Sequence, residues 1–76
     1  MEDINIAFAK TLKNLRTSKG LTQEELAELS GIDYKYLQKL ESQNPSSPTL
    51  STLKKLSTGL EISLQDLVEQ LEKSQF

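Results

Sequence analysis

The side chains with the clearest chemical use gather in residues 34–42. If this segment is a helix, Leu37 and Leu40 define its buried direction, because helical residues are spaced 100° apart. The side chains that then point away from the core are Lys35, Gln38, Lys39 and Ser42. Lysine ammonium groups match the acceptors of guanine in the major groove of DNA, and a glutamine amide matches adenine. The segment therefore predicts a surface that contacts base edges, although the same stripe is compatible with a merely solvated helix face.

The composition narrows the chemistry, because the 76 residues contain no cysteine and no histidine. Disulfide scaffolds, thiolate zinc sites, thiol catalysis and imidazole general bases are excluded. We therefore expect no enzyme activity, no metal and no cofactor. Nine Lys and Arg against eleven Asp and Glu give a net charge of −2, which argues against binding nucleic acid through bulk charge. No apolar run approaches the roughly 18 residues of a membrane span, so we expect a cytoplasmic, nucleoid-associated protein with no membrane partner.

The apolar residues follow a helical period throughout, and no stretch alternates with a period of two. The expected fold class is therefore all-α. The first helix is expected at about 4–18, with Asp3 as its cap and Gly20 as the left-handed residue that stops it. The second helix begins after Thr22, which has capping-box spacing with Glu25.

The second helix must end near Gly31, because a third helix of about 34–42 follows closely, with Asp33 as its cap. Two short helices joined by a glycine-containing turn form a helix-turn-helix, here at about 22–42. This arrangement favours the DNA-contacting interpretation of the polar stripe over the solvated one.

Two further helices complete the chain. Thr49 caps the fourth, which Gly59 is expected to break, and Ser63 with Asp66 opens the fifth. The apolar stripe of the fifth helix consists of Leu64, Leu67, Val68 and Leu71. No repeat, linker or low-complexity segment divides the chain, so residues 1–76 are expected to form a single domain.

The charge distribution predicts that two copies bind together. The first 40 residues carry six acids and six bases, and residues 41–76 carry five acids and three bases. A monomer can therefore neutralise few phosphates, and useful binding needs two recognition helices placed one DNA turn apart. Leu71 and Phe76 are candidates for the symmetric seam of such a homodimer, with a solvent-exposed Phe76 as the alternative.

Several motifs follow one another along residues 12–68: Leu12-Lys13-Asn14-Leu15-Arg16, Gly20-Leu21-Thr22-Gln23-Glu24-Glu25-Leu26-Ala27, Gly31-Ile32, Leu37, Leu40-Glu41 and Pro48-Thr49-Leu50. This pattern resembles the Cro/C1-type helix-turn-helix family, the xenobiotic-response-element (XRE) group. That family includes phage repressors, restriction–modification controller proteins and SinR-like regulators. The resemblance implies a compact five-helix, lambda-repressor-like domain that binds inverted-repeat operators as a homodimer.

The resemblance also implies roles for single residues. The residues at or beside positions that meet base edges are Tyr34, Lys35, Gln38 and Lys39. Tyr34 could contact a thymine methyl group or offer its hydroxyl to a phosphate. The residues expected at the DNA backbone are Thr22, Gln23, Tyr36, Ser42 and Asn44. Gln23 matches the glutamine that heads the second helix, where free backbone N–H groups can also hold a phosphate.

Arg16 and Glu41 match an ion pair that commonly joins the first and third helices. We expect this pair to be structural, because a glutamate beside the core needs a partner. The chain departs from the family pattern at Gln43, where many members have glycine, so the backbone contact from Asn44 is expected to differ. Tyr36 is also bulkier than usual, and it could either stack on the sugar–phosphate backbone or pack beside the core.

The leading hypothesis is a sequence-specific transcriptional regulator, of the repressor or controller type, that acts as a homodimer on an inverted repeat. Because no ligand-sensing domain is expected, control would come from protein concentration and operator arrangement. The alternative is an antitoxin or adaptor that uses the same fold to bind a partner protein. The net charge of −2 and the acidic second half favour this alternative modestly.

Overall fold

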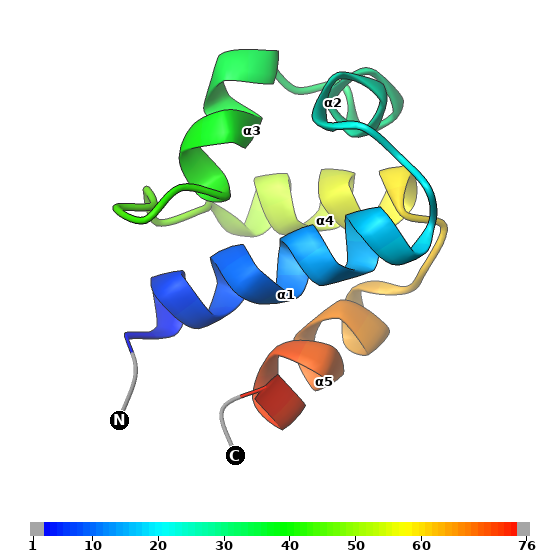
Figure 1. Cartoon of the computed structure of the whole chain (residues 1–76). Coiled ribbons are helices and arrows are strands. Elements are labelled where there is room, and N and C mark those ends of the chain that lie inside the picture. The colour runs from blue at the N-terminus through cyan, green and yellow to red at the C-terminus, as the bar shows by residue number, and fades with distance from the viewer. Residues whose placement is uncertain (1–2, 75–76) are drawn as a thin grey trace.

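The computed structural model describes residues 3–74, which form five α-helices. They are α1 (Ile4–Ser18), α2 (Gln23–Ser30), α3 (Tyr34–Leu40), α4 (Leu50–Gly59) and α5 (Leu64–Ser74). In Figure 1, α2 and α3 lie above α1 and α4, and α5 lies below them. α2 packs against α3 and α4, and α5 packs against α1 and α4. The expected all-α, five-helix architecture is confirmed.

The helices begin where side-chain caps were expected. At α1, Asp3 Oδ1 accepts a hydrogen bond from the Asn5 N–H at 2.8 Å. At α2, Thr22 Oγ1 accepts from the Glu25 N–H at 3.1 Å and Glu25 Oε1 accepts from the Thr22 N–H at 2.9 Å, which completes the capping box. The remaining caps are Asp33 for α3, Thr49 for α4 and Ser63 for α5. Each such cap contributes about 1 kcal/mol, so these starts are encoded locally.

Within residues 3–74, one leucine-rich core joins all five helices, and Phe8 of α1 is the one aromatic side chain among its fully buried members. Its buried members are Phe8, Leu12, Leu26, Ala27, Leu37, Leu40, Leu56, Leu60 and Leu67. The apolar stripes extend beyond this core, since Ile4, Leu29 and Leu50 are 56%, 57% and 72% exposed. Ile4 and Leu50 occupy the first positions of α1 and α4, and Leu29 the second-last of α2, where few neighbours remain to cover a side chain.

The glycines that follow α1 and α2 reverse the chain as expected. Gly20 and Gly31 have φ of +72° and +69°, the left-handed region that suits a residue without a β-carbon. α4 ends at Gly59, as expected, but the left-handed residue of the following turn is Glu61, with φ of +59°. Gly59 is instead the buried last residue of α4, where a β-carbon would overlap the Ser30 hydroxyl of α2. The missing side chain at Gly59 allows α4 and α2 to approach each other closely.

α3 ends at Leu40, two residues before the predicted end of the 34–42 helix. The Ser42 N–H and hydroxyl both donate to the Lys39 carbonyl oxygen, at 3.2 and 2.7 Å. This tighter turn takes the place of the next α-helical hydrogen bond, a competition that serine side chains often win. Ser42 therefore lies just after the helix rather than on its exposed face.

Candidate nucleic-acid interface

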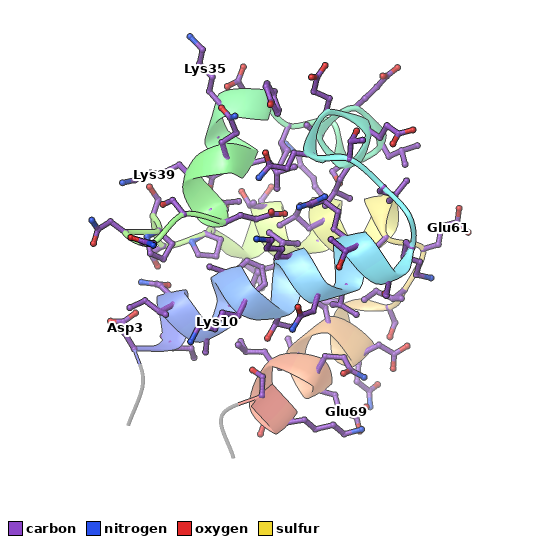
Figure 2. The ribbon with its side chains drawn as sticks, in the orientation of Figure 1. Asp3, Lys10, Lys35, Lys39, Glu61 and Glu69 are labelled. Carbon is purple, nitrogen blue, oxygen red and sulfur yellow. The ribbon has the colours of Figure 1, made fainter. Side chains whose placement is uncertain are left out.

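α3 turns its polar face away from the rest of the molecule. Leu37 and Leu40 on its inner face are completely buried. Lys35 and Lys39 are exposed, and Figure 2 shows both side chains projecting away from the helical body. Within residues 3–74, neither ammonium group has a hydrogen-bond or ion-pair partner. Both cations are therefore available to an external acceptor.

Tyr34 and Gln38 share this outer face and are joined to each other. The Gln38 amide nitrogen, Nε2, donates a hydrogen bond to the Tyr34 hydroxyl at 3.1 Å. Tyr34 is 38% exposed, and Gln38 is exposed as well. The four side chains expected at base edges are thus brought together on one outward surface of α3, namely Tyr34, Lys35, Gln38 and Lys39.

Tyr36 faces the scaffold instead. Its ring is half-buried and packs against the core, and its hydroxyl lies 3.4 Å from Thr52 Oγ1 on α4. Thr52 Oγ1 is in turn 3.0 Å from the hydroxyl of Thr49, the cap of α4. Tyr36 was expected either to stack on the DNA backbone or to pack beside the core, and the structure shows it packed beside the core. Tyr36 fixes α3 against the first turn of α4.

Arg16 and Glu41 form the expected ion pair. Arg16 Nε lies 2.8 Å from Glu41 Oε2, and their side chains are only 11% and 2% exposed. The Arg16 Nη1 group also donates to the Leu21 carbonyl oxygen at 2.8 Å. The hydrogen bond to Glu41 raises the pKa of the Arg16 guanidinium above its ordinary value, against the opposing effect of burial. The ion pair therefore favours the charged form of the arginine and ties α1 to the end of α3.

Gln23 joins the same network from the first position of α2. Its Nε2 donates to Glu41 Oε1 at 3.0 Å, so the half-buried side chain supports the end of α3. The backbone N–H groups of Gln23 and Glu24 have no hydrogen-bond partner within residues 3–74 and are open to an acceptor. The carboxylates of Glu24 and Glu25 lie in the same turn and oppose an anion there.

The other residues expected at the DNA backbone lie at the edges of this surface. Thr22 and Asn44 are exposed, and Thr22 Oγ1 also serves as the α2 cap. Ser42 is half-buried, and its hydroxyl donates a hydrogen bond to the Lys39 carbonyl oxygen. Gln43, in the position where the family often has glycine, is exposed in the turn that follows α3.

Two lysines that were not singled out from the sequence lie next to this turn. Lys10 and Lys13 of α1 line a shallow groove together with Glu41, Ser42 and Gln43. Their spacing of three residues, which places both on one helix face, was the available signal. The juxtaposition with residues 41–43 depends on tertiary packing and could not be read from the spacing.

The expected dimer seam is described only in part. Leu71 of α5 is half-buried and lines a cleft with Ile4, Phe8 and Leu53. Phe76 lies outside the described residues. A second apolar strip on α5 consists of Leu64 and Val68, which line a shallow groove. Val68 is 38% exposed.

Within residues 3–74, no cluster of three or more acidic, cysteine or histidine side chains could hold a metal ion. In the same part of the chain, none of the helices is long and apolar enough to span a membrane.

A model of the helix-turn-helix family matches residues 12–67. The control protein C.MunI of a Mycoplasma species is 38% identical over 74 residues, which cover 96% of this chain and 99% of C.MunI. The transcriptional regulator SutR of Escherichia coli (strain K12) is 40% identical over 62 residues, which cover 82% of this chain. The matched regions make up only 34% of SutR and 39% of the E. coli regulator PuuR, so this chain spans well under half of those two proteins.

The restriction–modification controller protein C.Esp1396I, solved bound to a 19-base-pair DNA duplex, is similar to this chain in structure. The two superpose with a TM-score of 0.89 over 99% of each chain, at 31% sequence identity. The family match and this likeness agree with the arrangement of α2 and α3 (Figure 1). The chain therefore belongs to the Cro/C1-type helix-turn-helix family of DNA-binding transcriptional regulators, which are not enzymes.

Proposed function

We propose that this protein is a sequence-specific transcriptional regulator that places α3 in the major groove of its operator. The observation that carries the proposal is the pair of exposed, unpartnered lysines, Lys35 and Lys39, on a helix whose opposite face is fully buried. Such a helix is held rigidly while its outer side chains remain free to meet base edges. The likeness to C.Esp1396I, which was solved with a DNA duplex, supports DNA as the partner.

The proposed contacts divide by position on the surface. The side chains at base edges are Tyr34, Lys35, Gln38 and Lys39. Those at the DNA backbone are Thr22, Gln23, Tyr36, Ser42 and Asn44. Gln23 and Tyr36 also hold α3 in place, so a phosphate contact from either would add to a structural role. The free N–H groups of the first turn of α2 support a phosphate near Gln23.

We further propose that two copies bind an inverted repeat. With a net charge of −2, one copy neutralises few phosphates, and a second half-site supplies the missing affinity. The seam is assigned to α5, where the exposed Val68 is added to the two residues expected from the sequence, Leu71 and Phe76. Such a dimer would act in the cytoplasm, at the nucleoid, as a repressor or controller that occupies promoter DNA. Residues 1–76 serve as one domain in this proposal.

An antitoxin or adaptor function is the second candidate. It is favoured by the side chain of Leu29 on α2, which is 57% exposed although it is apolar. Three carboxylates accompany it on α2, those of Glu24, Glu25 and Glu28. A surface of this kind fits a basic protein partner better than DNA.

The proposal is tested by selecting bound duplexes from a random DNA pool and measuring their affinity by gel shift. We expect enrichment of an inverted repeat. Lys35→Ala and Lys39→Ala should each reduce discrimination between operator and mutated sites by about 1–3 kcal/mol, the value of a bidentate base contact. Lys19→Ala is the matched control, because Lys19 is also an exposed lysine and directly follows α1 rather than lying on α3.

The outcomes separate the candidates. A pool without enrichment, no shift at low salt and a protein that co-purifies at fixed stoichiometry would select the adaptor function. A uniform loss of affinity across all DNA sequences would place the lysines on phosphates and contradict their assignment to base edges.

A further inference from the structure

Tyr34 and Gln38 form a hydrogen bond on the part of α3 proposed to enter the major groove. They lie four residues apart, so they are stacked on one helix face. Gln38 Nε2 donates to the Tyr34 hydroxyl at 3.1 Å, although both side chains are exposed. Within residues 3–74 neither Lys35 nor Lys39 has a comparable side-chain partner. Gln38 is therefore the base-edge candidate whose polar group is oriented before DNA arrives.

The hydrogen bond determines which groups of the amide remain free. A glutamine amide has two N–H donors and one carbonyl acceptor, and one donor is used by Tyr34. If the hydroxyl accepts the N–H that points away from the carbonyl oxygen, the second N–H and that oxygen are left side by side. Adenine presents an acceptor, N7, next to a donor, the N6 amino group, whereas guanine presents two acceptors in the same places. The free groups of Gln38 thus match adenine and mismatch guanine.

Without the tyrosine hydroxyl, the same amide would be less selective. The terminal torsion of glutamine is broad and roughly two-fold, so an unrestrained amide presents either its oxygen or its nitrogen at a given place. An amide that rotates can satisfy several base edges, at an entropic cost in each case.

We propose that Tyr34 is a positioning residue that orients Gln38 for adenine, and that the pair sets the preference at one base pair of each half-site. This inference rests on the proposed function, since it assumes that α3 reads DNA. It assigns the phenol hydroxyl to Gln38, in place of the thymine-methyl and phosphate contacts considered above for Tyr34.

The test is Tyr34→Phe, which removes the hydroxyl and keeps the ring. Each half-site position of the operator selected by the wild-type chain is replaced in turn by the other three base pairs, and affinities are compared by competition gel shift. Gln38→Ala identifies the base pair that Gln38 reads. At that pair, Tyr34→Phe should lower the preference for adenine by about tenfold, toward the lower end of the range for a bidentate contact. All other positions should keep their wild-type preferences.

A double mutant separates the pair from its alternatives. If Tyr34 acts through Gln38, Tyr34→Phe has no further effect on specificity in a Gln38→Ala background. A uniform loss of affinity that persists in that background would place the hydroxyl on a phosphate and overturn the inference. A lowered melting temperature with an unchanged specificity profile would show that the hydrogen bond only stabilises the helix, and would overturn it too. Absence of any operator for the wild-type chain is a different result, because it contradicts the proposed function itself.

Discussion

Arg16 Nε lies 2.8 Å from Glu41 Oε2, and Arg16 Nη2 lies 3.0 Å from the other oxygen of the same carboxylate. Gln23 Nε2 donates to that second oxygen at 3.0 Å. One nearly inaccessible carboxylate thus joins α1, the start of α2 and the end of α3. Because the orientation of α3 decides which bases its side chains can reach, this network links the stability of the fold to the geometry of the interface.

Arg16→Ala is expected to lower the free energy of unfolding by about 3 kcal/mol, because it leaves the Glu41 carboxylate buried without its cation. Urea unfolding followed by circular dichroism measures this loss. Lys19→Ala, three residues away in the chain and exposed, should change stability by less than about 0.5 kcal/mol. A similar loss of unfolding free energy in both variants would mean that the ion pair contributes no more to stability than an exposed lysine does.

Glu61→Gly is expected to stabilise the protein by about 0.5–1 kcal/mol. Glu61 has φ of +59°, which strains any residue that carries a β-carbon. The turn itself is well formed, since the Glu61 N–H donates to the Thr58 carbonyl oxygen at 3.1 Å and the Ile62 N–H donates to the Ser57 carbonyl oxygen at 3.0 Å. Thermal melting measures the gain. Glu61→Ala is the control, because alanine keeps the strain, and a melting temperature raised equally by both changes would refute this explanation.

Gly59→Ala is expected to destabilise the protein by about 1–3 kcal/mol, the usual cost of overpacking. Its β-carbon would lie 3.1 Å from the Ser30 backbone nitrogen and 3.2 Å from Leu26 Cδ1, and it would overlap the Ser30 hydroxyl. That hydroxyl is buried and has no hydrogen-bond partner within residues 3–74. Ser30→Ala alone should therefore be neutral or slightly stabilising.

The same pair provides an internal check by urea unfolding. Gly59→Ala should cost less in a Ser30→Ala background, because one of the three close contacts is then gone. Strictly additive effects would contradict the proposed overlap.

The fold was largely predictable because its determinants are local. Caps such as Thr22 with Glu25 are set by residues three apart, and the buried face of α3 follows from the helical period through Leu37 and Leu40. Helix ends were harder to predict. Glycine commonly ends helices, so the sequence suggests only that role for Gly59. The packing of α2 against this position shows that Gly59 also allows the two helices to approach closely.

The candidate site likewise has features that could be predicted from the sequence and features that could not. The outward direction of Lys35 and Lys39 follows from the angle to the buried leucines, so it was available from the sequence. The hydrogen bond from Gln38 to Tyr34 depends on side-chain rotamers, and the contact between Tyr36 and Thr52 depends on how α3 meets α4. Spacing alone carries neither piece of information.

Val68→Asp is expected to prevent dimerisation while leaving the monomer folded. Val68 is 38% exposed and lies beside the core residue Leu67, so the new carboxylate would face the seam without entering the core. Sedimentation measures the oligomeric state. Operator affinity should fall by about 10²–10⁴-fold, because each half-site then binds independently.

Glu69→Gln is the matched control for this variant, because Glu69 lines the same groove of α5 with a polar side chain. It should leave both the dimer and the operator affinity essentially unchanged. A Val68→Asp protein that remains dimeric would exclude this strip and leave the seam to the cleft side of α5, where Leu71 lies beside Ile4 and Phe8. Leu71→Asp would then be the informative variant. A wild-type chain that is monomeric at every concentration, yet binds a single half-site tightly, would contradict the requirement for two copies that follows from its net charge.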